Sequence, residues 1–340
     1  MGNTGGDVRN DEHHDTGAHG GDAAPGETDA GDAGNADAEG ADGGGVDAGD
    51  TDSGETDAGP SGPWVPANLP ANICDTPSTA ELNVPAGGER SLTSDGTCDA
   101  LVPQDETPPN ICVRKFASAT IAGSLRVETN ERALAIVVTG SFTIPTGGVV
   151  QAISMGDFRG RPSFEYPDVF VGLPGAGHIG AGESTGLAGG PAYGPTSGTQ
   201  LVAGAFAGSG SLWHGVGGTA GGALQLVACS ELALTGTVSV RGGDGSPGNS
   251  HYVPHAEYPG GGGGGGSGGT LVLDAKRIVG NGGALLAVGG QGGAAGFDPE
   301  APGIMTSPGG AGAPGRTVIH VPQGTSLPAI TSTPPAEVLH

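Results

Sequence analysis

The sequence predicts an all-β protein, an irregular β-solenoid in which successive turns of chain stack as in a parallel β-helix. The first observation is composition, since 72 of the 340 residues are glycine and only 4% are aromatic. An ordinary globular domain contains about 7% glycine. The second observation is an internal repeat of short apolar strands. The third is a set of long glycine-rich insertions that return at one place in the repeat.

The first element is an acidic segment over residues 1–60. It holds 16 Asp and Glu residues, 16 glycines and one basic residue, Arg9, and it contains no Leu, Ile, Phe, Tyr or Trp. A segment with so little apolar surface to bury cannot offset the conformational entropy lost on folding. We therefore expect residues 1–60 to form a disordered, self-repelling tether.

A proline-rich segment over residues 61–111 follows, and its prolines exclude long helices. We expect an irregular, disulfide-stapled cap in which apolar residues such as Trp64 cover the end of the fold behind it. The candidates for disulfide bonds are Cys74, Cys98, Cys112 and Cys229. The first three lie within 39 residues, so at least one bond is expected there. The pairing stays open, because four cysteines allow three connectivities.

The repeat is clearest in residues 221–245 and 268–292, which align without a gap at an offset of 47 residues with nine identities in 25 positions. Apolar residues alternate along each copy, which is the pattern of half-buried strands. Leu226 and Leu273 should therefore stack in the core, as should the pair two residues before them. Asp274 aligns with Val227, and a charge at this position predicts that the neighbouring face is outward and solvated.

Further copies extend the repeat in both directions. One more step of 47 residues reaches Gly315, where we expect a third, truncated copy. Upstream, residues 133–152 fit the same template with one inserted residue, and residues 119–127 match its second half. The recurring glycine at the corner between strands predicts a left-handed turn. We place the repeat domain at residues 112–325 and a C-terminal tail at 326–340.

Glycine-rich insertions separate the copies at about residues 153–220, 243–267 and 290–314. Residues 151–315 contain 47 glycines, including seven in a row from Gly260 to Gly266. Because they recur at one place in the repeat, the insertions should project from one side of the solenoid. Polyglycine forms threefold helices that pack closely without Cβ atoms. We favour such packed polyglycine II helices, and mobile loops are the alternative.

Composition and motifs exclude several function classes. The net charge of −24 would repel nucleic acid. No apolar run is long enough for a transmembrane helix. The sequence contains no G-x-S-x-G, H-E-x-x-H or P-loop motif, and its acidic residues do not recur in pairs at one repeat position. We expect no catalytic residues, no cofactor and no enzyme activity.

The insertions carry the only side-chain groupings that suggest a ligand. A weak metal-site candidate consists of His251, His255 and Glu257. Aromatic candidates for stacking on a sugar ring are Tyr252, Tyr258, Trp213 and Tyr193. The plainer hypothesis is that these aromatic residues anchor long loops to the body.

The segments GGGGGGSGGTLVLDA, GGALLAVGGQGGAAG and CVRKFASATIAGSLRV resemble the glycine-rich secreted proteins and lipoproteins of myxobacteria and related bacteria. The resemblance covers about residues 98–320 and implies an exported surface protein with little chemistry. The start MGNTGGDV lacks a signal peptide. Small residues before an acidic spacer are typical of the region after a lipidated cysteine. We expect a lipid anchor upstream, with a secreted protein without lipid as the alternative.

These observations predict an extracellular or outer-surface protein with a structural or adhesive role. An alternative is a carbohydrate-binding or carbohydrate-active β-solenoid that uses the aromatic loops at 153–220 and 243–267. A second alternative is a subunit of an extracellular filament. The expected partners are extracellular polysaccharide or cell-surface components, and the oligomeric state is left open.

Overall fold

A computed structural model describes residues 64–104, 110–154, 176–178, 181–184, 192, 198–207, 215–248, 260–297 and 306–340. These residues belong to one compact unit, 57–340. They contain 17 β-strands, arranged in a 10-stranded and a 7-stranded sheet, and within these ranges no residue is helical. The predicted all-β class is thus confirmed, while the acidic segment 1–60 lies outside the described residues.

The larger sheet collects the first strand of successive turns of chain. In order of pairing, and all parallel, these strands are β4 (Ile111–Phe116), β7 (Ala133–Val138), β11 (Ala223–Leu234), β13 (Thr270–Val279), β15 (Arg316–His320) and β17 (Glu337–Leu339). The same sheet holds a second stack of parallel strands, which are β1 (Glu81–Val84), β5 (Ser118–Ile121), β8 (Ser141–Ile144) and the C-terminal half of β11. Strand β3 (Ala100–Val102) pairs antiparallel with β4.

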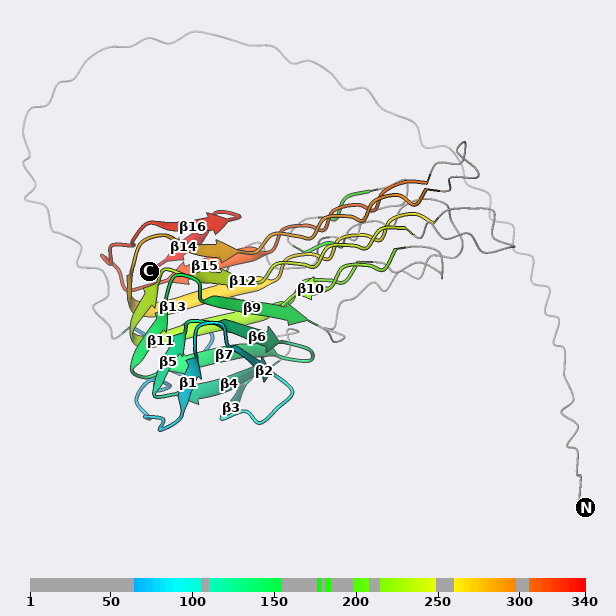
Figure 1. The fold of residues 1–340 in the computed structure, drawn as a ribbon. Helices are drawn as coiled ribbons and strands as arrows, with labels where there is room; N and C mark the ends of the chain where they lie inside the picture. Colours follow the sequence, from blue (N-terminus) through cyan, green and yellow to red (C-terminus); the bar gives the residue numbers. More distant parts are fainter. Residues whose placement is uncertain are drawn as a thin grey trace, which may run out of the picture. The chain divides into compact units, whose positions relative to one another are not determined.

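The smaller sheet collects the last strand of each turn of chain. Its parallel strands are β2 (Glu89–Thr93), β6 (Ser124–Glu128), β9 (Val149–Ser154), β12 (Thr237–Ser239), β14 (Gly283–Leu286) and β16 (Ile330–Thr333). Strand β10 (Ala220–Gly221) pairs antiparallel with β9. The chain thus returns repeatedly to the same two sheets, an arrangement compatible with a β-solenoid-like fold (Figure 1).

The pairing of β11 with β13 confirms the repeat. Leu224 lies opposite Leu271 and Leu226 opposite Leu273, at the expected offset of 47 residues. A bulge after Ala228 shortens the offset by one residue in the second half of the strands. Strands β7 and β11 pair in the same way, so like residues stack from one turn of chain to the next.

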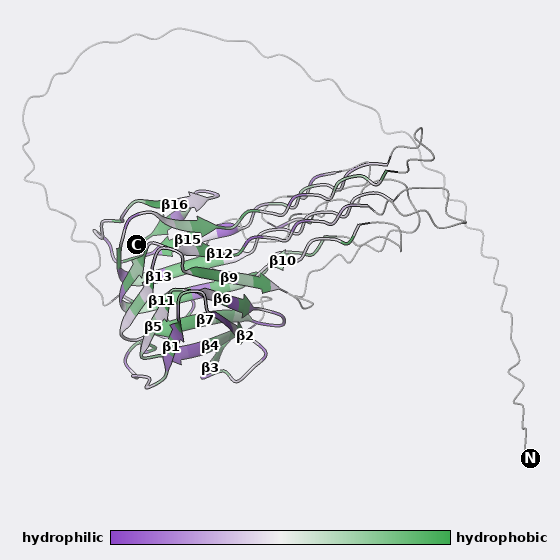
Figure 2. Cartoon of the chain, in the orientation of Figure 1, coloured by the Kyte–Doolittle hydropathy of each residue, from purple (hydrophilic) through white to green (hydrophobic). Residues whose placement is uncertain are grey.

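The apolar core lies between the two sheets. All four leucines of these pairs are fully buried, and they belong to one hydrophobic cluster that extends from Leu82 to Val321. Figure 2 shows the hydrophobic colour gathered on strands in the middle of the stack, such as β9 and β13. The alternation of apolar residues therefore predicted the inward face correctly.

The opposite face of the first strands is also buried, so the expectation that Val227 and Asp274 face solvent is wrong. Both are 0% exposed. Val227 belongs to a second hydrophobic cluster with Leu69, Ile73 and Leu201, which come from distant parts of the chain. The alternation gave the direction of these side chains, but local sequence does not reveal which segment covers them.

The positions of the other copies need two corrections. Strand β15 pairs with β13 at an offset of 46, with Leu271 opposite Thr317, so the copy expected from Gly315 at an offset of 47 is displaced by one residue. A one-residue shift moves every side chain of a strand to the other face. Upstream, the sequence predicts one inserted residue in the copy at 133–152. The structure has two, because the turn after Ile144 is two residues longer than the turn after Leu234.

Close packing, rather than a left-handed turn, explains the glycine that recurs at the corner. Gly236 and Gly283 are absent from the residues with positive φ. A Cβ atom on Gly236 would lie 2.4 Å from the carbonyl oxygen of Gly148 on the neighbouring turn of chain. The left-handed conformation falls instead one position before the corner, at Gly147 and Gly282, both with φ of 87°.

The segments expected as cap and tail both contribute strands. Strands β1 and β2 lie within residues 61–111 and pair in parallel with β5 and β6. Strands β16 and β17 lie within residues 326–340 and pair with β14 and β15. Within residues 61–111, residues 64–74 cover the outside of the larger sheet, where Leu201 also packs, and we call residues 64–74 the covering segment.

Candidate functional site: the glycine-rich bundle

The described parts of the glycine-rich insertions run side by side beyond the ends of the strands. The chain leaves the small sheet after β12 and returns to β13 through residues 260–269, and it repeats this excursion between β14 and β15. Backbone hydrogen bonds join the outgoing and returning segments. We call these segments, with residues 203–207 and 215–221, the glycine-rich bundle (Figure 1).

Hydrogen bonds in the bundle recur at every third residue. The N–H groups of residues 262, 265 and 268 donate to the carbonyls of residues 307, 310 and 313. The N–H groups of residues 263, 266 and 269 donate to those of residues 246, 243 and 240. The first neighbour is therefore parallel to the central segment 260–269 and the second is antiparallel.

The carbonyl groups of the central segment accept hydrogen bonds with the same period of three residues. They accept from residues 215, 218 and 221 on one neighbour and from residues 290, 293 and 296 on another. Ser267 N–H donates to Ala205, and Gly265 accepts from Ala176. The central segment is thus hydrogen-bonded to six other stretches of chain, and this satisfies buried backbone groups that form no strand.

The spacing of these segments leaves no room for side chains. A Cβ atom on Gly266 would lie 2.0 Å from the carbonyl oxygen of Thr219, and one on Gly290 would lie 1.8 Å from that of Gly243. Contacts of this kind recur along the bundle. The high glycine content of the insertions is therefore a packing requirement in the described segments.

Polar side chains at the bundle act on its backbone. Ser267 Oγ accepts the N–H of Ala205 at 2.7 Å, and Ser246 Oγ accepts that of Val216 at 2.7 Å. His178 is fully buried, with Nε2 3.3 Å from the carbonyl oxygen of Val202. Burial lowers the pKa of His178 to about 4. The ring therefore stays neutral at physiological pH.

A buried polar cluster holds the covering segment on the larger sheet. Asp274 Oδ1 accepts the N–H of Ala67 at 3.0 Å and lies 2.6 Å from Nδ1 of His320, and Oδ2 accepts Nε2 of Gln225 at 2.7 Å. Trp64 stacks on His320 with ring centroids 6.2 Å apart. A buried carboxylate is tolerated when its oxygens are hydrogen-bonded, as they are here.

Two disulfides fix the segments around this cluster. Cys74 joins Cys229 across 155 residues and so fastens the covering segment to β11, while Cys98 joins Cys112 across 14 residues. The expected bond within the 39-residue window is confirmed. Closing a loop of about 15 residues stabilises by about 3 kcal/mol in the chain-entropy model, and longer loops by more.

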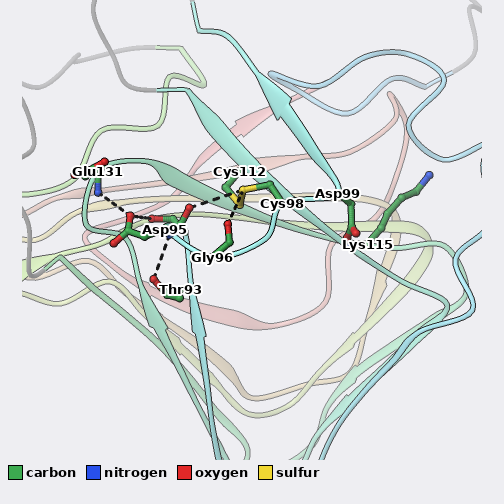
Figure 3. The surroundings of a disulfide bond; sticks show 9 residues. Thr93, Asp95, Gly96, Cys98, Asp99, Cys112, Lys115 and Glu131 are labelled. Atoms are coloured by element: carbon green, nitrogen blue, oxygen red, sulfur yellow. Dashed lines mark hydrogen bonds between the residues drawn. A yellow bond between two sulfur atoms is a disulfide. The ribbon is translucent and has the colours of Figure 1, made fainter.

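Figure 3 shows the shorter disulfide, Cys98–Cys112, with Asp99 and Lys115 near it. Asp99 Oδ2 accepts the backbone N–H of Lys115 at 2.6 Å. Burial lowers the pKa of Lys115, and the charges of Asp99 and Asp75 oppose that shift. These groups lie on the surface of the first turns of chain and converge on no reactive atom.

The residues that the sequence singled out for ligands are not among those described. His251, His255 and Glu257 lie outside the described ranges, as do Tyr193, Trp213, Tyr252 and Tyr258. Within the described part of the chain, no group of three or more His, Cys, Asp or Glu residues could hold a metal ion. In the same part, no helix is long and apolar enough to cross a membrane.

Sequence reasoning missed the buried polar cluster. A charged residue on the strand face opposite the apolar core usually faces solvent, so the sequence predicts an exposed Asp274. The available signal was the polar Gln225 on the neighbouring strand, two residues before the position that aligns with Asp274. Polar residues gathered on one strand face indicate a covered hydrogen-bonding site as well as a solvated surface.

Comparison with known proteins adds no relative: no family model, no curated protein and no solved structure matches the chain.

Proposed function

We propose that the protein is an exported, surface-tethered structural or adhesive module without turnover. In this proposal an irregular β-solenoid carries the glycine-rich bundle, whose segments are polyglycine II helices. The observation that carries the proposal is the central segment 260–269, which hydrogen-bonds to its neighbours at every third residue and has no space for Cβ atoms.

The helical assignment rests on the period. A polyglycine II helix has three residues per turn and makes no internal hydrogen bonds, so its backbone groups point outward in three directions. Residues three apart then face the same neighbour. The residue sets 262, 265, 268 and 263, 266, 269, each with its own partner segment, support this geometry.

A structural role follows from what the bundle is made of. The central segment forms backbone hydrogen bonds with its neighbours along its length, and the close packing of the bundle favours a stiff projection over a cleft. Two disulfides are compatible with an oxidising, extracellular location. The acidic composition of residues 1–60 supports a tether.

The test uses microspheres coated with the full chain and held under flow on a surface of bacterial cell-wall polysaccharide. The variant Gly266→Ala/Gly290→Ala keeps length and charge but places two Cβ atoms where backbone oxygens lie. We expect the variant to detach at a force several-fold lower than the wild type. The control is Gly96→Ala, whose Cβ would meet its nearest atom at an ordinary 3.4 Å.

Equal detachment forces for the wild type and the double variant would contradict a role for the ordered bundle. Release of new reducing ends from the polysaccharide would contradict the absence of turnover and would identify an enzyme.

A further inference from the structure

The covering segment leaves a cavity of about 300 Å³ beside strand β13. Its walls include Trp64, Val65, Pro66, Asn72, Asp75 and Lys276. Ligand pockets range from about 300 to 1,000 Å³, so this cavity suits a single small ring rather than a chain of them.

Two opposite charges face this cavity without neutralising each other. Lys276 and Asp75 are both exposed, and neither forms an ion pair with any residue that the structure describes. Lys276 is also one of only two lysines in a chain of net charge −24. A ligand that places an anionic group at Lys276 and hydroxyl donors at Asp75 would complement both ends.

Apart from Asn72, the remaining walls are apolar, and two of them are held in place. The ring of Trp64 is stacked on His320, and Cys74, which also lines the cavity, is bonded to Cys229. A site whose walls are fixed before binding loses less conformational entropy when a ligand enters. Indole and proline surfaces suit the apolar face of a sugar ring.

We propose that this cavity binds a pyranose that carries a carboxylate, namely one hexuronate residue of an acidic extracellular polysaccharide. The carboxylate pairs with the Lys276 ammonium, ring hydroxyls donate to Asp75 and exchange hydrogen bonds with Asn72, and the ring lies against Trp64 and Pro66. The site is separate from the glycine-rich bundle, so the proposal stands whether or not the bundle is adhesive.

The experiment follows the indole N–H signal of Trp64 by NMR in the full chain. The chain has two tryptophans, and the Trp213→Phe variant leaves Trp64 as the single indole signal. Sodium D-galacturonate and D-glucuronate are titrated, with D-galactose, D-glucose and sodium acetate as probes of the ring alone and the charge alone. We expect a saturable shift with a uronate at about millimolar concentration, typical of so small a ligand.

Two matched variants test the role of the charge. Lys276→Met should weaken uronate binding by about tenfold or more, since it removes the charge-assisted bond. Arg90→Met also removes one exposed positive charge, but from strand β2 of the smaller sheet and not from the residues that line the cavity, and it should leave the binding curve unchanged. Circular dichroism should show both variants folded, because Lys276 is exposed and its loss leaves no buried gap.

Three results would overturn the proposal. They are the absence of a saturable shift with either uronate at tens of millimolar, a shift that acetate reproduces, and an undiminished shift in Lys276→Met. Each concerns a free monosaccharide in solution, so failure here leaves the adhesion test of the bundle unaffected.

Discussion

The stacked sheets and the glycine-rich bundle are both closely packed, but the sheets pack through side chains and the bundle packs through backbone atoms. In the sheets, Leu226 is buried between turns of chain and opposite Leu273 on the next strand, so side chains fill the interior. In the bundle, Gly266 has backbone atoms where a side chain would start. From β11 to β15 the two regions repeat together at an offset of 46 or 47 residues, and the two insertions between these strands each begin and end on a strand.

The comparison shows that low hydrophobicity does not by itself imply a loose segment. The sheets gain stability from burial of apolar surface. The bundle has little such surface and depends on backbone hydrogen bonds between segments that the sheets hold in register. The bundle should therefore depend on the folded sheets for its order, whereas a substitution that disrupts the bundle should leave the sheets folded.

The largest effect is expected at Val227, under the covering segment. Val227→Asp places a charge in a dry face directly opposite Asp274 on the paired strand. We expect a loss of about 4 kcal/mol or more in the free energy of unfolding, enough to prevent folding of a marginal protein. Denaturant unfolding measures this. Val216→Asp, at a residue that is 65% exposed, should cost no more than about 0.5 kcal/mol, and equal behaviour of the two variants would refute the buried outer face.

Truncation of the leucine stack should be next in size. Leu226→Ala leaves a cavity between Ile136 and Leu273 on the flanking strands and should cost about 2–5 kcal/mol in unfolding free energy. Leu101 is 52% exposed, so Leu101→Ala serves as the control and should change stability by about 0.5 kcal/mol at most. A similar small change for both would mean that Leu226 is not in the core.

Acid should destabilise the fold through His178, because protonation places a charge on a fully buried ring. The pKa of His178 is about 4 in the folded chain, below its unfolded value near 6.5, so only the unfolded state takes up this proton between those pH values. Stability from this group is complete above about pH 6.5 and falls with pH, by up to about 3 kcal/mol at pH 4. The melting temperature against pH should be flatter over this range in His178→Gln. Identical slopes would show that His178 protonates freely in the folded protein.

The smallest change should come from a single methyl group in the bundle. Gly266→Ala must displace Thr219 and should cost about 1–3 kcal/mol, as overpacking does. We expect limited proteolysis to open the bundle while the amides of β11 stay protected from hydrogen exchange. If β11 loses protection equally, the two regions unfold as one unit, and the proposed one-way dependence is wrong.

The sequence predicted the parallel strands, the offset of 47 and the inward leucines, because alternation and repetition are local signals. It did not predict the one-residue shift at β15, which depends on the length of a glycine insertion. It also misplaced Asp274, because the partners of that carboxylate include Ala67, 207 residues away. Contacts between segments so far apart in the chain produce no repeating sequence pattern from which they could be predicted.

The candidate site was less predictable than the fold. The sequence allowed packed glycine helices or mobile loops, since composition alone does not fix which carbonyl accepts each glycine N–H. The sequence does not predict the cavity beside Lys276, because its walls come from the covering segment with the adjoining Asp75 and from β13, which are far apart in the chain. The sequence predicts Trp64 only as an apolar cover, whereas in the structure its ring also stacks on His320.

Amide hydrogen exchange of the central segment tests the account most directly. The N–H groups of Gly263, Gly266 and Gly269 donate to the carbonyls of residues 246, 243 and 240, and none of the three glycines lies in a strand. We predict that all three exchange as slowly as amides in the middle of β11. Exchange of Gly263 and Gly266 at the rate of an unstructured glycine peptide, with β11 still protected, would contradict the bundle.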